Sequence, residues 1–318
     1  MNLSSGAWAA VMALASYAAC AQPYPAKPVR VVVPFAPGGG TDISARQFAQ
    51  KLSETFKQQF VIDNRGGAGG MIGIEMAVKA PPDGYTLMMM SGSYSASSAL
   101  HKPAWDPIKA ILPVCEFGAT PFVLVVHPSV KANNAKELIA LAASKPNALT
   151  YASTGTGGIT HLATELMLHM TKTQMVHVPY KSTGAALTDV LAGQAPVLMG
   201  SLLPVTPHIH SGKLRGLAVT TAKRWYSLPD MPTLSDTIPG YVVELWHGTM
   251  APAGTPLSIV NALNAAINRA METPEMKKNL EQQGMIPTGG TPARFGERIA
   301  ADYHNWLKVV QSAKIKAD

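Results

Sequence analysis

Strand-length apolar segments alternate with helix-length segments along almost the whole chain. The first such pair is the run VRVVVPF at residues 29–35 and the helical pattern at 42–56. Continuous apolar runs are typical of parallel strands that are buried on both faces, and the helices between them are typical of right-handed crossovers. The sequence therefore predicts an α/β fold in which helices cover both faces of parallel sheets.

The same pattern predicts most of the individual elements. Apolar runs bounded by turn residues place strands at 29–35, 59–64, 85–91, 111–119, 121–128, 148–153, 174–180, 195–200, 214–220 and within 241–256. Helical spacing places helices at 42–56, 71–78, 135–144, 159–170, 185–192, 257–271, 274–284 and 292–310, with another between 195–200 and 214–220.

The elements fall into two α/β units. The segment 223–240 has three prolines and neither helical nor strand periodicity, so it is expected to be a connection. The C-terminal helices could complete either unit. If they return to the first, the chain crosses between the units near Phe122 and again within 233–244. The two crossing strands can then act as a hinge. The expected boundaries are then 22–122 with 240–318 for one domain and 123–239 for the other, with the ligand cleft between them.

Two glycine-rich loops follow strands and precede helices: PGGGTD at 37–42, the first glycine loop, and STGTGG at 153–158, the second glycine loop. The first N–H groups of a helix lack internal partners and carry partial positive charge, so these loops suit a carboxylate or a phosphate. Alternatively, the glycines make tight turns and Thr41 is a helix cap. Neither loop continues as a nucleotide-binding motif, since no Gly-Lys-Ser/Thr follows.

Other polar residues stand at the ends of predicted strands. Ser91 follows an apolar strand and can offer its hydroxyl to a cleft, and Tyr180 ends another strand. His161 lies in the first helical turn after the second glycine loop, where it can either donate a hydrogen bond to a ligand or brace the loop. A third glycine-rich stretch, residues 64–73, is expected either to cradle the ligand or to shape the rim of the site.

Composition narrows the possible functions. The net charge is +7, from 26 Lys+Arg and 19 Asp+Glu, but the basic residues are scattered, which argues against nucleic-acid binding. No cofactor motif and no metal-ligand spacing is present; His208 and His210 lack a third partner. Cys115 lies in a strand-like run and is interpreted as a small buried side chain.

The N-terminal segment is interpreted as an export signal, residues 1–21. Its apolar stretch from Ala7 to Ala19 is too short to span a bilayer. Small residues at 19–21 predict cleavage after Ala21, although no Lys or Arg precedes the apolar stretch. An alternative is a lipoprotein that is modified at Cys20. The expected location is the periplasm.

In sum, these motifs resemble the Bug-type periplasmic solute receptors of tripartite tricarboxylate transporters. The matching pieces are PFAPGGGTD (34–42), NRGGAGGMIG (64–73), PDGYTL (82–87), YASTGTGG with HLA (151–163), HVPYK (177–181), GKLRGLAVT (212–220) and APAGTP (251–256). They follow the family's order and span nearly the whole mature chain.

The resemblance implies a type II-like periplasmic-binding-protein fold and a monomeric receptor that is not an enzyme. It implies that the two glycine loops grip one carboxylate of a small organic acid (a di- or tricarboxylate, an amino acid or an aromatic acid), which is delivered to permease subunits. Carried over residue by residue, the expected grip is Gly39, Gly40, Thr41, Ser153, Thr154 and Thr156. The full predicted contact set adds Phe35, Ser91, His161, Tyr180 and Ser201.

The chain departs from the family pattern after the predicted strand at 195–200. Gly200 and Ser201 stand where relatives often have an aromatic residue followed by an acidic or amide residue. This region faces the variable end of the ligand in relatives. The smaller residues suggest a bulkier or less amino-acid-like ligand, and a Gly200→Phe change is expected to alter ligand preference.

The sequence is also compatible with two other functions. The receptor could act mainly as a ligand sensor for a membrane signalling partner. Alternatively, a hydrolase or transferase could use the loops as an anion hole, with Ser153 or Thr160 as nucleophile and His161 as base. That alternative requires a nucleophile and a base near the loops, and a hydrogen bond between Ser153 and His161 together with turnover of an ester would support it.

Overall fold

The structure is a computed structural model that describes residues 24–317. Its strands are β1 (Val29–Val33), β2 (Phe60–Asn64), β3 (Thr86–Ser91), β4 (Ile111–Val126), β5 (Thr150–Ser153), β6 (Val176–Pro179), β7 (Val197–Ser201), β8 (Arg215–Val219), β9 (Glu244–Pro252) and β10 (Ile286–Pro287). The helices are α2 (Gly40–Phe56), α3 (Met71–Val78), α4 (Ser93–His101), α5 (Ala135–Ser144), α6 (Ile159–Thr171), α7 (Thr183–Leu191), α8 (Leu202–His210), α9 (Leu257–Glu272), α10 (Pro274–Gln282) and α11 (Pro292–Ala313), with 3-10 turns η1 (Ala68–Gly70) and η2 (Leu234–Asp236). The predicted α/β class is confirmed.

The strands form one continuous mixed sheet in the order β2-β1-β3-β9-β4-β7-β5-β6. The outer strands are parallel, as predicted: β1 pairs with β2 and β3, and β5 pairs with β6 and β7. The central strands depart from that prediction, because β9 runs antiparallel to β3 and to β4, and β4 runs antiparallel to β7. A chain that crosses to a second unit and returns must run in opposite directions on its two passes, and this makes the centre antiparallel.

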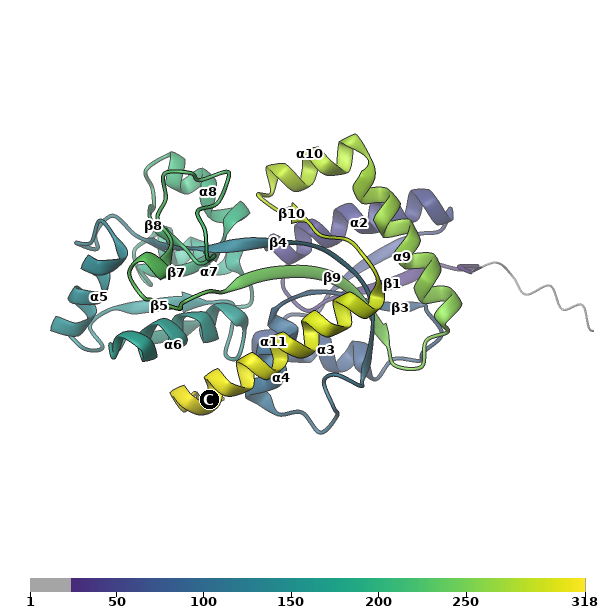
Figure 1. The fold of residues 1–318 in the computed structure, drawn as a ribbon, viewed down its shortest axis with the longest axis horizontal. Coiled ribbons are helices and arrows are strands. Elements are labelled where there is room, and N and C mark those ends of the chain that lie inside the picture. Colours follow the sequence, from purple (N-terminus) through teal and green to yellow (C-terminus); the bar gives the residue numbers. More distant parts are fainter. Residues whose placement is uncertain (1–23, 318) are drawn as a thin grey trace, which may run out of the picture.

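Strand β4 belongs to both ends of the sheet. Up to Pro121 it pairs with β9, and from Phe122 onward it pairs with β7 and β8. In Figure 1, helices α5 to α8 surround the far end of β4, whereas α2, α3, α9 and α10 surround β1 and β3. Helix α11 lies across the two long strands and contacts both α4 and α6. The long strands β4 and β9 thus connect two groups of helices.

The sequence did not predict helix α4. Its sequence SYSASSALH carries little amphipathic signal, because serine, a poor helix former, recurs through it. The helix forms through tertiary contacts: all eight residues from Ser93 to Leu100 are buried, and it packs against α11. Ser95, for example, donates to the carbonyl of Ile299 (3.3 Å).

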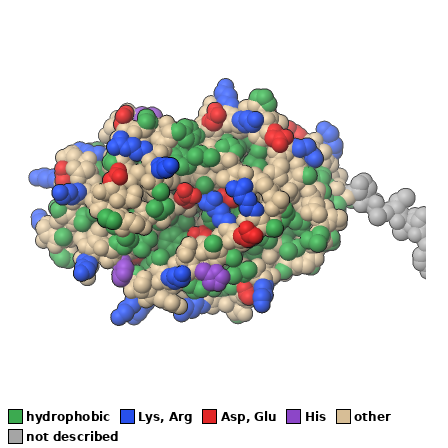
Figure 2. All heavy atoms as spheres, in the orientation of Figure 1, with side chains coloured by type: hydrophobic (Ala, Val, Ile, Leu, Met, Phe, Trp, Pro, Cys, Tyr) green, Lys and Arg blue, Asp and Glu red, His purple; other side chains and the backbone are tan. Residues whose placement is uncertain are grey.

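The surface carries mixed charges, and Cys115 is buried. On the face drawn in Figure 2, Lys and Arg side chains are spread over the molecule and interspersed with Asp and Glu. Within residues 24–317, no helix combines the length and apolar character needed to cross a bilayer. Cys115 is fully buried, as expected, and burial raises the pKa of its thiol to about 12.

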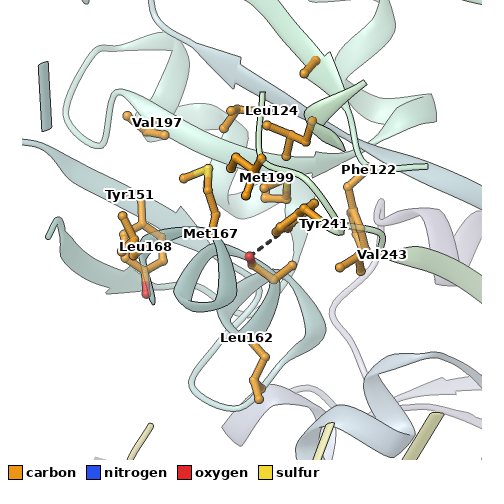
Figure 3. Packing of buried hydrophobic residues seen from close by; sticks show 14 of the residues in the cluster. Phe122, Leu124, Tyr151, Leu162, Met167, Leu168, Val197, Met199, Tyr241 and Val243 are labelled. Atoms are coloured by element: carbon orange, nitrogen blue, oxygen red, sulfur yellow. Dashed lines mark hydrogen bonds between the residues drawn. The ribbon is translucent and has the colours of Figure 1, made fainter. Parts of the chain in front are cut away.

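A buried tyrosine links the connection 223–243 to α6. Tyr241 is fully buried among Phe122, Met199 and Val243, and its hydroxyl donates to the carbonyl of Ala163 (2.8 Å; Figure 3). Because Ala163 lies inside α6 (Ile159–Thr171), its carbonyl keeps its helical hydrogen bond, and a change of Tyr241 to Phe removes only this second, buried hydrogen bond.

We therefore expect Tyr241→Phe to lower the free energy of unfolding by about 1–2 kcal/mol in urea denaturation. The matched control is Tyr226→Phe, because the Tyr226 hydroxyl also donates to a carbonyl, that of Glu281 (3.2 Å), but its side chain is half exposed. The control should lose less than about 0.5 kcal/mol. Equal losses in the two variants would contradict this account.

Candidate functional site

A cavity opens where the β1–α2 and β5–α6 loops approach each other over the sheet. Its lining residues are Phe35, Gly39, Gly40, Thr41, Ser91, Ser93, Phe122, Thr154, Ile159, Thr160, Ser182, Thr183, Ser201 and Leu245. The space between the lining atoms is about 320 Å³ with the open solvent at its mouth included. Seven predicted residues line it: Phe35, Gly39, Gly40, Thr41, Ser91, Thr154 and Ser201.

The sheet forms the floor of this cavity. Phe122 of β4 is paired with Ser201 of β7, and opposed residues in an antiparallel pair project to the same face. Leu245 of β9 is paired with Thr120, two residues before Phe122, so it shares that face. The floor therefore combines strands from both ends of the sheet.

The first glycine loop is braced by Asp42. Asp42 is 3 % exposed, and its carboxylate accepts hydrogen bonds from the Gly38 N–H (3.0 Å), Arg46 Nε (3.0 Å) and Asn64 Nδ2 (2.9 Å). Burial alone would raise the pKa of this carboxyl, but the hydrogen bonds from Arg46, Asn64 and Gly38 outweigh it and lower the pKa. Asp42 is thus saturated by loop and helix groups, while Gly39, Gly40 and Thr41 line the cavity.

The second glycine loop is held by hydroxyls. Thr160 Oγ accepts from the Thr154 N–H (2.8 Å) and bonds to the Thr154 hydroxyl (2.9 Å). Ser153 is fully buried, and its Oγ accepts from the Gly155 N–H (3.1 Å) and bonds to His177 Nε2 (2.6 Å). These bonds fix the loop that begins helix α6 without any charged residue.

His161 is placed to brace the second glycine loop. Its Nδ1 accepts a hydrogen bond from the Gly157 N–H (3.1 Å), and its ring stacks on His177 with ring centres 4.1 Å apart. Burial, with the neighbouring His177 and His101, lowers the pKa of His161 to about 3. The imidazole is therefore neutral at physiological pH, and its acceptor nitrogen is engaged by the loop.

The third glycine stretch packs directly against the second glycine loop. A Cβ on Gly69, whose φ is +61°, would lie 2.4 Å from the Gly158 nitrogen and 2.5 Å from the Thr156 carbonyl oxygen. Ser97 of α4 donates to the carbonyls of both Gly69 (2.6 Å) and Gly157 (3.1 Å). The two loops thus meet backbone to backbone beside the cavity.

Four predicted site residues do not line the cavity: Ser153, Thr156, His161 and Tyr180. The Thr156 carbonyl lies 3.2 Å from His101 Nε2, and the Tyr180 hydroxyl donates to Asp189 (2.6 Å). Ser153 bonds to His177 and not to His161, so the hydrogen bond that would support the hydrolase alternative is not formed. All four residues support the loop region, and their contact with a ligand stays a prediction.

Seven lining residues were absent from the predicted set: Ser93, Phe122, Ile159, Thr160, Ser182, Thr183 and Leu245. The Ser182 Oγ accepts from the Ala185 N–H (3.2 Å) as the cap of α7. A serine directly before a predicted helix was the sequence signal that could have placed Ser182 at this helix start. Phe122 and Leu245 gave no such signal, because their role depends on which face of β4 and β9 meets the loops.

The structure corrects our expectation for Gly200. A Cβ on Gly200 would lie 2.5 Å from Val205 Cγ1 and 3.2 Å from Leu198, so this position faces the apolar core and not the cavity. Its neighbour Ser201 lines the cavity, since successive residues of a strand point to opposite faces. Gly200→Phe would overpack the core instead of reshaping the ligand site.

The chemistry of the lining residues suits an uncharged polar grip on an anion. No Lys, Arg, Asp, Glu or His is among the cavity-lining residues, whereas Ser and Thr hydroxyls and the start of α2 are. Within residues 24–317, no group of three or more His, Cys, Asp or Glu is arranged to hold a metal ion.

Comparisons with known proteins agree with this geometry. Residues 44–315 match the family model of the tripartite tricarboxylate transporter family receptor. Protein BugT from Bordetella pertussis is 35% identical over 302 residues, which span 93% of this chain and 93% of that protein. The R. palustris protein Rpa4515, solved with adipate, has a TM-score of 0.87 and 35% identity, covering 92% of this chain and 99% of that chain. MatC from Rhodopseudomonas palustris, solved with bound malate, has a TM-score of 0.87 and 30% identity, covering 90% and 100%.

The low pKa of His161 predicts a loss of stability on acidification. In the unfolded chain the pKa of His161 is about 6.5, so below that pH the unfolded state binds a proton at His161 and the folded state does not. Proton binding therefore favours the unfolded state. From pH 7 to 5.5 this costs about 1 kcal/mol of folding free energy, and the loss grows as the pH falls toward 3.

Urea denaturation of His161→Gln at these two pH values should show a pH-dependent loss that is smaller than that of the wild type by about 1 kcal/mol. His304→Gln is the control, because the His304 side chain is exposed. An unchanged pH dependence in His161→Gln would overturn the assignment.

Proposed function

Because the chain belongs to the tripartite tricarboxylate transporter receptor family, we propose that it binds a small organic carboxylate in the cavity above the sheet and delivers it to a membrane permease. The observation that carries the proposal is the approach of the α2 start and the second glycine loop to one uncharged cavity. Helix N-termini stabilise anions through free N–H groups and the helix dipole. In addition, two similar proteins were solved with the dicarboxylates adipate and malate.

The proposal includes a hinge. In the proposal, the expected domains are 22–122 with 240–318 and 123–239, of which the structure describes residues 24–317, and β4 and β9 join them. The cavity draws Gly39 to Thr41 from one side and Thr154, Ser182 and Ser201 from the other, so a ligand between them would bridge the two domains. Such bridging favours the closed arrangement in proportion to the contacts that exist only when the domains are closed.

Binding without catalysis fits the site. Thr154 and Thr160 bond to each other, and the candidate nucleophile Ser153 is fully buried. The proposed location is the periplasm, as expected of a receptor in this family. The predicted export signal, residues 1–21, lies outside the described residues.

Ligand binding should stabilise the protein. At a ligand concentration of 100 times its dissociation constant, the folded state should gain about 2.7 kcal/mol, seen as a higher melting temperature. The screen uses adipate, malate, hexanoate and aromatic acids, and hexanamide is the control because it matches hexanoate without the charge. No stabilisation by any carboxylate, or equal stabilisation by hexanamide and hexanoate, would refute the proposed function.

Gly69→Ala should weaken binding by separating the two loops that meet beside the cavity. Its new Cβ would press on the Gly158 nitrogen, and we expect affinity for a carboxylate found in the screen to fall at least about tenfold, or about 1.4 kcal/mol. Gly212→Ala is the matched control: its φ is also positive (+69°), but nothing lies within 4 Å of its Cβ position.

Both variants should lose about 1 kcal/mol of folding free energy from the left-handed backbone, and Gly69→Ala should lose more because of the clash. Calorimetric titration separates affinity from stability. Wild-type affinity in Gly69→Ala would show that the contact between the loops does not matter for binding.

A further inference from the structure

His247 of β9 is a buried polar residue with no assigned role. Its side chain is 3 % exposed, and its Nδ1 has no hydrogen-bond partner among residues 24–317. Burial lowers the pKa of the imidazole to about 4, so the ring is neutral at physiological pH. A buried polar nitrogen without a partner costs folding free energy, and it therefore calls for an explanation.

The register of the sheet points His247 toward the ligand side. His247 is paired with Ser91 of β3, which lines the cavity, and opposed residues share a face. It is also two residues from Leu245, another lining residue, and alternate residues of a strand share a face. His247 thus lies on the same face as the cavity floor.

A smaller side chamber adjoins the main cavity at this point. It is lined by Gly40, Ser44, Thr120, Ser201, Leu202, Leu203, His247, Gln283 and Met285, and the space between these atoms is about 220 Å³ with the adjoining open solvent included. Gly40 and Ser201 line both spaces. A Cβ on Gly40 would lie 3.6 Å from Ser201 Cβ and 3.9 Å from His247 Cε1, so the missing side chain of Gly40 leaves the passage between them open.

Most polar groups of the side chamber are already bonded to one another. The Ser44 hydroxyl donates to Gln283 Oε1 (2.8 Å), and the Gln283 amide donates to Gln47 and to the Asn279 carbonyl. Ser201 Oγ has only a long contact of 3.5 Å with Thr183 Oγ. His247, Ser201 and Thr120, whose hydroxyl makes no hydrogen bond within residues 24–317, are therefore the polar groups of the side chamber that can turn to a ligand entering from the main cavity.

We propose that the side chamber receives the far end of the carboxylate ligand, and that His247 with Ser201 selects ligands whose far end is an uncharged hydrogen-bonding group such as a hydroxyl or a carbonyl. This inference rests on the proposed function and names the ligand class for the same site. A neutral imidazole and a hydroxyl can each donate and accept, which matches a neutral polar group. No Lys or Arg lines either space, so a second carboxylate would be buried there without a countercharge.

The test compares acids that differ only at the far end. Calorimetric dissociation constants are measured for hexanoate, 6-hydroxyhexanoate and adipate, and for butanoate, 4-hydroxybutanoate and succinate. In the series whose length fits, the hydroxy acid should bind about tenfold more tightly than the methyl-terminated acid and more tightly than the diacid. A diacid that binds more tightly than its hydroxy acid in both series would overturn the inference.

Variants assign the preference to His247. His247→Phe should reduce the hydroxyl-over-methyl preference about tenfold, whereas His247→Asn, which keeps a donor and an acceptor, should retain most of it. Thr249→Val is the control, because the buried Thr249 hydroxyl on the same strand also has no partner in the described chain but lines neither space. Gly40→Ala tests the passage independently: its methyl group should weaken the hydroxy acid more than the shorter propanoate.

The outcomes distinguish this inference from the proposed function. If no carboxylate binds, both are wrong. Suppose that carboxylates bind, but that His247→Phe leaves the ratio of the dissociation constants of the methyl-terminated and hydroxy acids unchanged and Gly40→Ala leaves the ratio for the hydroxy acid and propanoate unchanged. The proposed function then stands and the side-chamber inference is refuted. If His247→Phe does not fold, an unchanged ratio in Gly40→Ala is sufficient to refute it.

Discussion

The pairing of β4 with β9 is the interaction on which the rest of the structure depends. These two strands run antiparallel from Ile111 to Pro121 and Pro252 to Glu244, and they join the parallel strands at both ends of the sheet. The buried backbone N–H and C=O groups of this pair need hydrogen-bond partners, and the pairing spans the two strands despite two register irregularities, so the strands hold the flanking loops at a defined separation. The candidate ligand cavity exists because the glycine loops reach over this shared floor from opposite ends.

The site uses backbone geometry where many anion sites use cationic side chains. Asp42 accepts hydrogen bonds from Gly38, Arg46 and Asn64, and His161 accepts one from Gly157. These charged and titratable groups near the loops therefore stabilise the loops themselves. This leaves hydroxyls and a helix start to face the cavity. Because no charged side chain lines the cavity, none can attract a charged group at the far end of a ligand. Selection then depends on which buried polar groups of the protein a ligand hydrogen-bonds.

Much of the fold was predictable because its signals are local. Helices α3 (Met71–Val78) and α5 (Ala135–Ser144) have the predicted bounds, since helical spacing and flanking strands or turns mark them. Helix α4 was missed because its serines carry no periodic signal and its burial comes from α11, about 200 residues away in the sequence. The antiparallel centre of the sheet was missed for a similar reason: apolar content predicts burial of a strand but not its direction.

By itself, the sequence determined the α/β class, the two glycine loops at helix starts and their suitability for an anion, because each depends on residues adjacent in the chain. The tertiary structure decided which side chains meet. Gly200 faces the core and Ser201 faces the cavity. Ser153 bonds to His177 and not to His161. Leu245 and His247 lie beneath the loops. These outcomes depend on strand register, and a shift of one residue exchanges the two faces of a strand, which no local pattern in a fully buried strand can specify.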